Sequence, residues 1–249
     1  MKRALVAMLF CAFAFTLAFA QEEPIPPKRS KAAKIGGLGG FTPGWLFVDV
    51  KEINNFLQAG KGAPLKDNGV FLTGGAGAAY IMVVPNLRVG GLGMSGSIKS
   101  SSLDGAGVRR DAELHVGFGG ATFEYVVPIV EKFDVAFGAM LGGGGIDLTV
   151  RQNNGGQNTW TGEQGLLLNG SGNAPNVTRK LSGSFFVAIP SVNLEYAIVS
   201  WLGVRLGASY VTMFVPSWKV DDEFELLGVP GSVSGKGFMI NAGLFVGTF

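Results

Sequence analysis

Cysteine, histidine and charged residues are all scarce in this chain of 249 residues. It holds one Cys and one His, and charged residues make up 15% of it, against about 25% in an average soluble domain. A disulfide framework is therefore excluded, and a single His argues against a three-ligand zinc site, so we expect no metal and no cofactor. Intrinsic disorder is excluded too, because disordered chains are poor in aromatic residues and this chain has 19 Phe, 4 Trp and 4 Tyr.

The first twenty residues have the order of a secretory signal. Two basic residues precede an apolar run, which closes on Ala18-Phe19-Ala20 before an abruptly polar segment. We predict a signal peptide over residues 1–20 and a flexible periplasmic leader over residues 21–34, which holds three prolines and charges of both signs. A retained membrane anchor is the alternative, because about 17 apolar residues can just span a bilayer.

Export would change the charge and the cysteine content. The signal contains Cys11 and two basic residues but no acidic residue, so the mature chain would hold no Cys and 18 residues of each charge. A balanced chain of this kind does not support a nucleic-acid partner. No mature segment reaches the run of about 18 apolar residues that indicates a spanning helix. A β-barrel needs no such run, because its strands alternate between lipid and lumen.

Eight extended segments follow the leader. They are rich in Val, Phe, Tyr and Gly, are bounded by Gly, Pro and Asn, and often alternate in polarity, as between Val204 and Phe214. We predict strands over residues 35–49, 69–82, 87–99, 110–127, 133–150, 181–198, 202–216 and 236–249.

The connections between these segments alternate in length. Those after segments two, four and six are tight, whereas those after segments one, three, five and seven are longer. This asymmetry is typical of an even-stranded outer-membrane barrel with short periplasmic turns and long external loops. We therefore predict an all-β fold over residues 35–249, an eight-stranded antiparallel up-and-down transmembrane β-barrel in the cell outer membrane. Its partners would include outer-membrane lipid and lipopolysaccharide. A soluble secreted barrel is the alternative.

Aromatic residues flank the three tight hairpins at similar spacings. Tyr80, Tyr125 and Tyr196 each enter a turn, and Trp201 lies within the last of them. The similar spacings support a hairpin of one geometry repeated three times. We predict that these four residues form an aromatic belt at one membrane–water interface. The alternative is that they are ordinary turn-flanking aromatics of a soluble sandwich.

The end of the chain carries a resemblance to a known class of proteins. The signal, the absence of mature cysteine, the eight alternating segments and the terminal Gly243-Leu-Phe-Val-Gly-Thr-Phe249 together resemble the small eight-stranded outer-membrane barrels of bacteria. Members of that class end on an aromatic residue, and the barrel-assembly machinery reads this end. The resemblance implies that Phe245 and Phe249 form the assembly signal, although Gly247 stands where a bulky residue is usual. It is architectural and implies no particular activity.

Charged residues inside the predicted strands are the sharpest feature of the sequence. An Arg or Lys facing lipid near the bilayer midplane costs about 2 to 4 kcal/mol, so alternation should turn such residues into the lumen. We predict a lumenal charge network of Arg88, Glu124, Glu195 and Arg205 that fills a narrow barrel. Further strand charges at Glu113, Asp134 and Asp147 are expected to face the lumen as well. A proton or ion pathway through the same charges is the alternative.

Three other features predict local structure. The apolar alternation slips by one residue across the glycines at 142–145, which predicts a β-bulge. Residues 49–60 have the pattern of a short amphipathic helix that packs across the barrel rim or binds a partner. The long loop over residues 151–180 is the segment best suited to contact a surface partner.

Three functions remain open on this evidence. The first is a non-enzymatic barrel that stabilises the envelope or presents surface loops to partners, and this is the one we favour. The second is a narrow channel or transporter for small or apolar solutes. The third is a lipid-modifying enzyme that would use His115, the single histidine, with Glu113 and a serine such as Ser95 or Ser209.

Overall fold

The computed structural model describes the greater part of the predicted barrel. Its described residues are 36–81, 83–154, 176–233 and 235–247. The predicted signal peptide and leader, Phe249 and most of the long loop over 151–180 lie outside these ranges, so those predictions stay as they are.

Within these ranges the chain is almost entirely antiparallel β-sheet. The strands are β1 (Gly37–Phe41), β2 (Gly44–Val48), β3 (Val70–Tyr80), β4 (Leu87–Leu103), β5 (Arg109–Val130), β6 (Phe133–Asn153), β7 (Val177–Val199), β8 (Leu202–Phe214), β9 (Trp218–Val220), β10 (Phe224–Leu226) and β11 (Lys236–Gly247). The helix α2 (Lys51–Ala59) and the short 3-10 turn η1 (Gly231–Val233) lie in loops. No described helix is long and apolar enough to cross a membrane.

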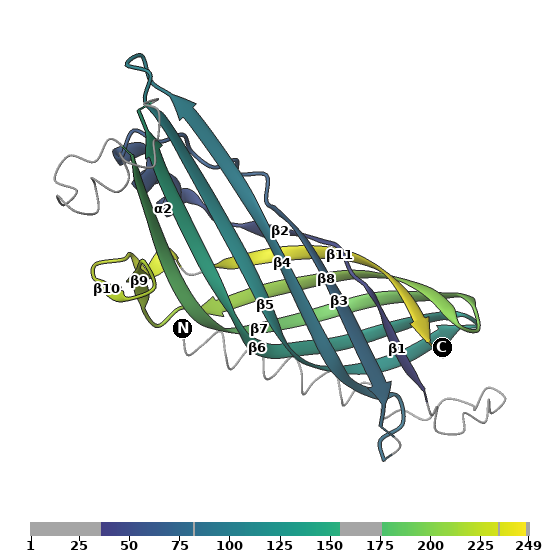
Figure 1. Ribbon diagram of the computed structural model, residues 1–249. Coiled ribbons are helices and arrows are strands. Elements are labelled where there is room, and N and C mark those ends of the chain that lie inside the picture. The colour runs from purple at the N-terminus through teal and green to yellow at the C-terminus, as the bar shows by residue number, and fades with distance from the viewer. Residues whose placement is uncertain (1–35, 82, 155–175, 234, 248–249) are drawn as a thin grey trace, which may run out of the picture. The chain divides into compact units, whose positions relative to one another are not determined.

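The strands close into a ring (Figure 1). Each long strand from β3 to β8 pairs antiparallel with its successor in the chain, and β8 pairs with β11. The ring closes because β11 and β3 both pair with β1 and β2, which act as one strand interrupted at Thr42 and Pro43. Proline lacks an N–H for the ladder, which accounts for the interruption. The prediction of an eight-stranded antiparallel barrel is confirmed.

One end of the barrel, here called the turn end, carries the tight connections over residues 81–86, 131–132 and 200–201. The other, the loop end, carries α2, β9 and β10 (Figure 1). The connection after β4 was predicted to be long but is a turn over residues 104–108, because β4 and β5 extend beyond the predicted bounds and pair to their tips. Asp104 stabilises this turn by accepting hydrogen bonds from the N–H groups of Ala106 and Val108.

Apolar side chains cover the outside of the barrel wall from the turn end towards the loop end. Along β8 the outward residues are exposed and apolar, whereas Arg205, Ser209 and their inward neighbours are buried. An apolar outer band around a polar interior is the arrangement of an outer-membrane β-barrel. Large residues of the band are Trp45, Phe71, Phe123, Phe137, Phe186, Leu206, Tyr210, Phe238 and Leu244.

Beyond the apolar band, the outer parts of β4 to β7 reverse the polarity of their two faces. Their inward residues Leu114, Val116, Ile146 and Leu148 belong to an apolar core that continues into the banded part of the barrel through Leu46, Leu72, Val187, Val211 and Met213. The outward residues of these outer parts are polar: Ser97, Lys99, Glu113, His115, Asp147, Thr149, Lys180 and Ser182. The prediction that Glu113 and Asp147 face the lumen is therefore wrong, because the strands continue beyond the apolar band and their outer face meets water instead of lipid.

The predicted bulge at the glycines of β6 is wrong as well. Residues 142–145 pair with β5 and β7 in unbroken register. The apolar residues change face because the strand leaves the apolar outer band and enters the apolar core. Glycine is required at Gly142 and Gly120 for another reason: a Cβ on either would lie within 2.2 Å of the backbone of the neighbouring strand. The two strands approach too closely there for a side chain.

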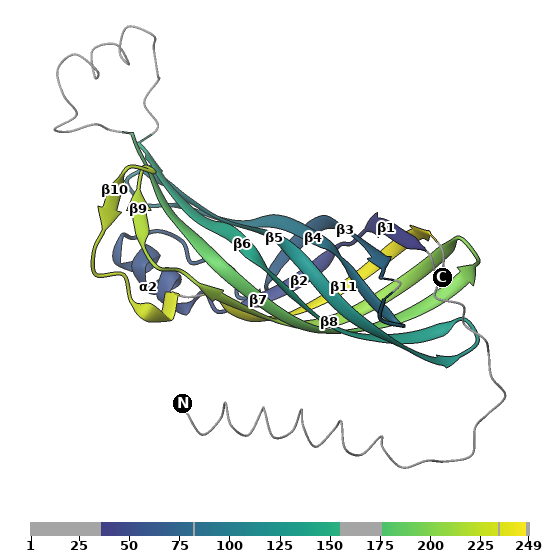
Figure 2. The ribbon, with the colours of Figure 1, turned by 90° about the horizontal axis from the view of Figure 1, so that it is seen from below.

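The helix α2 closes the loop end from the inside. Val50, Ile53 and Leu57 are buried in the apolar core, while the opposite face of the helix is exposed. The backbone N–H of Lys51 donates a hydrogen bond to the Asp49 carboxylate in the turn that leads into the helix, whose N-cap is Val50. Figure 2 shows α2 beside β9 and β10 at this end. The predicted amphipathic helix is confirmed, and it packs across the rim.

Candidate functional site

Four charged side chains meet in the lumen near the turn end. The Arg88 guanidinium donates hydrogen bonds to both Glu195 and Glu124, at 2.9 Å to Glu195 Oε2 and 2.9 Å to Glu124 Oε2. Arg205 donates to Glu124 Oε1 at 3.0 Å and lies 2.6 Å from Glu195 Oε1. Each arginine thus contacts both glutamates, and the structure brings together all four residues of the predicted charge network.

The strand register explains why these residues meet. Arg88 of β4 lies directly opposite Glu124 of β5, and Glu195 of β7 lies directly opposite Arg205 of β8. The two pairs therefore face each other across the lumen. Strand β6 lies between the two pairs in the wall, and at Gly138, which is opposite Glu124, a Cβ would lie 2.8 Å from Cγ of Glu124. The missing side chain leaves room for the cluster.

The cluster is buried and its charges balance. The Arg88 side chain has no exposed surface, and the other three side chains are at most 8% exposed. Two guanidinium groups and two carboxylates sum to zero, which is what a site cut off from water requires. Asn193 adds a hydrogen bond to Glu124 Oε1 at 3.3 Å. Sequence reasoning did not single out Asn193, although its position two residues before Glu195 places it on the same face.

Two aromatic rings lie against the arginines. The Arg88 guanidinium carbon lies 5.5 Å from the ring centroid of Tyr80, and that of Arg205 lies 4.6 Å from the ring centroid of Phe245. Both distances fall within the range of cation–π attraction. Tyr80 therefore does not belong to the predicted belt: it pairs directly with Arg88 in the register, so its side chain shares the inward face.

The other predicted belt residues lie on the outside. Tyr125 and Tyr196 are about half exposed and Trp201 is 58% exposed, all three at the turn end. Phe245, by contrast, is buried in the lumen. Its role in an assembly signal stays a prediction.

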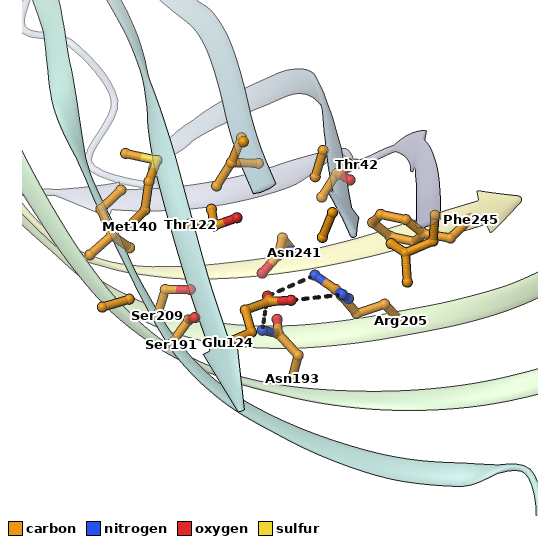
Figure 3. Close-up of a pocket in the computed structure, with 18 of the residues that line it drawn as sticks. Thr42, Thr122, Glu124, Met140, Ser191, Asn193, Arg205, Ser209, Asn241 and Phe245 are labelled. Atoms are coloured by element: carbon orange, nitrogen blue, oxygen red, sulfur yellow. Dashed lines mark hydrogen bonds and ion pairs between the residues drawn. The ribbon is translucent and has the colours of Figure 1, made fainter. Parts of the chain in front are cut away.

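A small cavity with both polar and apolar lining lies between the charge cluster and the apolar core (Figure 3). Its volume is about 40 Å³, room for about three or four water molecules at about 10 to 15 Å³ each. Thr122, Ser191, Asn193, Ser209 and Asn241 line it together with Arg205 and Glu124. Its size suits a few waters and excludes larger solutes.

The residues proposed for an enzyme are only partly brought together. Ser209 faces the lumen, whereas His115 and Glu113 face outward, and Glu113 pairs with Lys99 at 3.2 Å. His115 lies in the register between Ser97 on one neighbouring strand and Asp147 on the other. The described residues give His115 no hydrogen-bond partner, and Asp147 lies 3.6 Å from the Lys180 ammonium. The described residues hold no cluster that could bind a metal ion.

Comparison with known proteins finds similarity in fold alone. No protein-family model and no curated protein matches the chain. Among solved structures, the attachment invasion locus protein Ail of Yersinia pestis is 12% identical, with a TM-score of 0.36 over 85% of this chain and 99% of that one. A major outer membrane protein of Thermus thermophilus is 10% identical, with a TM-score of 0.40 over 85% and 98%. The outer membrane protease OmpT of Escherichia coli is 10% identical, with a TM-score of 0.28 over 90% and 99%.

Proposed function

We propose that the protein is a non-conducting β-barrel of the bacterial outer membrane, which stabilises the envelope or presents its loop end to partners. The observation that carries this proposal is that the lumen is filled twice along its length. Near the turn end the ion-paired cluster around Arg88 fills it, and near the loop end the apolar core and α2 fill it. The cavity between them is too small for a solute.

The membrane location is supported by the apolar outer band. Exposed side chains such as Phe137, Leu206 and Phe238 would each cost free energy in water, at about 25 cal/mol per Å² of apolar surface. In lipid they cost nothing, and the described strands of the ring pair on both sides around the closed part of the barrel. If the barrel is integral, membranes should retain the protein through a carbonate wash. Release into the supernatant would favour a soluble secreted barrel.

Conductance tests the closed lumen. Purified protein inserted into a planar bilayer should give no discrete conductance steps at ordinary salt and voltage, because ions would have to cross both the charge cluster and the apolar core. A known porin inserted in the same bilayer serves as the positive control. Discrete steps with the barrel folded would favour a narrow channel.

The proposed orientation places the loop end outside the cell. A cysteine introduced at Asp222, in the loop between β9 and β10, should react with a membrane-impermeant maleimide on intact cells. A cysteine at Ser200, in the tight connection between β7 and β8, should react only after the outer membrane is opened. The reverse pattern would invert the orientation.

The contacts with the barrel-assembly machinery, lipopolysaccharide and a surface partner also stay proposals. Deletion of Phe249 should lower the amount of folded barrel in the membrane more than Ser209→Ala does, since Ser209 faces the lumen. Normal assembly of the truncated chain would remove Phe249 from the assembly signal.

A lipid-modifying enzyme is a second candidate because of one row of residues. Ser97, His115 and Asp147 lie side by side on the outer face of β4, β5 and β6. These are the residue types of a nucleophile, a base and an orienting acid. The same strands carry the apolar outer band nearer the turn end. Lipid extracted from cells that express His115→Ala should then contain less deacylated lipid than wild type. Identical lipid profiles would end this candidate.

A further inference from the structure

An apolar pocket opens at the loop end between α2 and the chain that follows β8. It has a volume of about 340 Å³, which lies within the range of small-molecule sites. Helix α2 contributes Ile53 and Phe56, the inner faces of β6 and β7 contribute Leu148 and Leu181, and the chain after β8 contributes Trp218, Leu227 and Val229. Figure 2 shows α2, β9 and β10 gathered at this end.

The pocket lies on the water side of the apolar outer band. The strands that form its floor carry polar side chains on their outer faces at the same height: Asp147 precedes Leu148, and Lys180 precedes Leu181. Lipid contact therefore does not explain why Phe56 and Leu227 remain 54% and 81% exposed at the pocket. An apolar recess that faces water is a characteristic of ligand sites.

One charge decides which ligands the pocket suits. Glu52, in the first turn of α2, is the single charged residue among the described residues that line it. One carboxylate oxygen accepts a weak hydrogen bond of 3.4 Å from Asn55, which also lines the pocket. A carboxylate at an apolar recess attracts a cation or a hydrogen-bond donor and repels another carboxylate.

We propose that this pocket binds small amphiphiles with an alkyl chain and a cationic headgroup, with the chain against Trp218 and Leu148 and the headgroup at Glu52. The volume of about 340 Å³ lies near the lower end of the range for small-molecule sites, which favours a short amphiphile, with a chain of about eight carbons. Fatty acids of the same length are disfavoured. The proposal does not depend on whether the lumen conducts, and a conductance measurement leaves it untouched.

The test compares three probes of one length: octylammonium, 1-octanol and octanoate. Full-length mature protein is reconstituted in lipid nanodiscs, and tryptophan emission is followed during titration, with Trp218→Phe used to assign the signal. Octylammonium should bind saturably and about tenfold more tightly than octanoate, with octanol between them.

Two kinds of variant locate the site. Glu52→Gln should bring the three affinities to within about twofold of one another, and Glu52→Lys should reverse the order of the two charged probes. Glu223→Gln, which changes an exposed acid that does not line the pocket, should change neither. Val229→Phe, which fills the pocket, and Phe56→Ala, which removes an exposed wall, should weaken all three probes. Heat-modifiable electrophoretic mobility checks that each variant is a folded barrel.

The proposal has two clear ways to fail. If no probe gives a saturable change that Trp218→Phe abolishes, the pocket is only loose packing between α2 and the loop. If octanoate binds as tightly as octylammonium to the wild-type chain, Glu52 does not select the ligand and the proposed chemistry is wrong.

Discussion

The two halves of the lumen are filled by opposite chemistry within one set of strands. Near the turn end, β5 directs Glu124 inward and Tyr125 outward, and near the loop end it directs Leu114 inward and Glu113 outward. The hydrogen-bonded register does not change between them. A strand can therefore carry two environments in succession, and the surroundings of each half decide which class of side chain is buried.

The difference follows from what lies outside the wall. Where the outer face meets lipid, apolar residues lie on the outside, and any charged group must turn inward and find its partners there, as the cluster around Arg88 does. Where the outer face meets water, apolar residues turn inward and the segment packs like a soluble protein, with α2 as its second layer. The stability of the ion-paired half depends on each charge having an opposite charge beside it, whereas that of the apolar half depends on buried apolar area.

The largest effect should come from breaking the charge cluster. Arg88→Ala leaves Glu124 and Glu195 buried with only Arg205 between them, and removing one partner of a buried ion pair costs about 3 to 5 kcal/mol. Urea unfolding of the refolded barrel measures the loss. Arg109→Ala is the matched control, since the Arg109 side chain is 63% exposed and its ion pair with Asp111 lies on the surface. A loss no greater than that of the control would show that the cluster does not stabilise the fold.

Replacing both members of one ion pair tests whether the lost stability comes from an unpaired charge. Exchanging Arg205 and Glu195 together for apolar residues should recover part of the loss caused by Arg205→Ala alone, because no charge is then left without its cross-strand partner. Purely additive losses in this double-mutant cycle would mean that the two groups do not act as a pair.

The next largest loss of stability should come from removing a side chain of the apolar half, because this leaves a cavity and not an unpaired charge. Leu57→Ala removes a buried side chain of α2 and leaves a cavity in the core, which costs about 2 to 5 kcal/mol where the site cannot collapse. Since α2 lies in a loop, we expect about 2 kcal/mol. Leu57→Met, which conserves volume, is the control. If both variants unfold as wild type does, α2 is not part of the cooperative unit.

The charge network and the ring could be predicted from the sequence because a charged side chain that faces lipid has a high free-energy cost. Arg205 stands between two apolar residues in a clean alternation, so only one face was possible for it. The same argument applied to Glu113 and Asp147 led to the wrong face. The face that a charged residue takes depends on whether lipid or water lies outside the strand at that point. The local alternation does not mark where the lipid ends.

Two other errors came from reading a single strand without its neighbours. A change in the parity of apolar residues, as around the glycines of β6, can come from a bulge or from a change of surroundings, and only the register tells them apart. Tyr80 was grouped with Tyr125 by its distance from a turn, but its partner across the ladder is Arg88, and cross-strand partners share a face. The pocket beside α2 could not be predicted, because it forms between segments far apart in the sequence.

A smaller loss of stability should show what the contact between Phe245 and Arg205 contributes apart from the ion pairs. Phe245→Leu keeps an apolar side chain beneath Arg205 but removes the ring, so it should cost about 1 to 2 kcal/mol for the lost cation–π contact and packing. Leu244→Val, on the outer face of the same strand, is the control. If Phe245→Leu lowers the yield of assembled barrel in cells but not its stability after refolding, the residue acts in assembly instead.

The smallest effect should come from the ion pairs at the loop end. Arg179 lies 2.7 Å from the Asp221 carboxylate and Lys180 lies 2.9 Å from that of Asp222, and all four groups are at least 39% exposed. The hydrogen bond from the Lys180 backbone, with that from Arg179, holds the pKa of Asp221 below its ordinary value, and hydrogen bonds from Ser182 and Lys180 lower the pKa of Asp222.

A lowered carboxylate pKa fixes the direction of the pH dependence. The stabilisation is fully present above the ordinary carboxyl pKa of about 4 and is lost as the pH falls through the lower value of the folded state. Because β9 carries Trp218, acidification should shift its emission to longer wavelength, with a midpoint below pH 4. The double variant Asp221→Asn with Asp222→Asn should already show the shifted emission at neutral pH, while Glu225→Gln should not.

High salt should weaken the ion pairs of Asp221 and Asp222 and leave the buried cluster around Arg88 unchanged, since salt screens exposed charges far more than buried ones. Equal salt sensitivity of the two would contradict the distinction drawn here between a solvated rim and a sealed lumen.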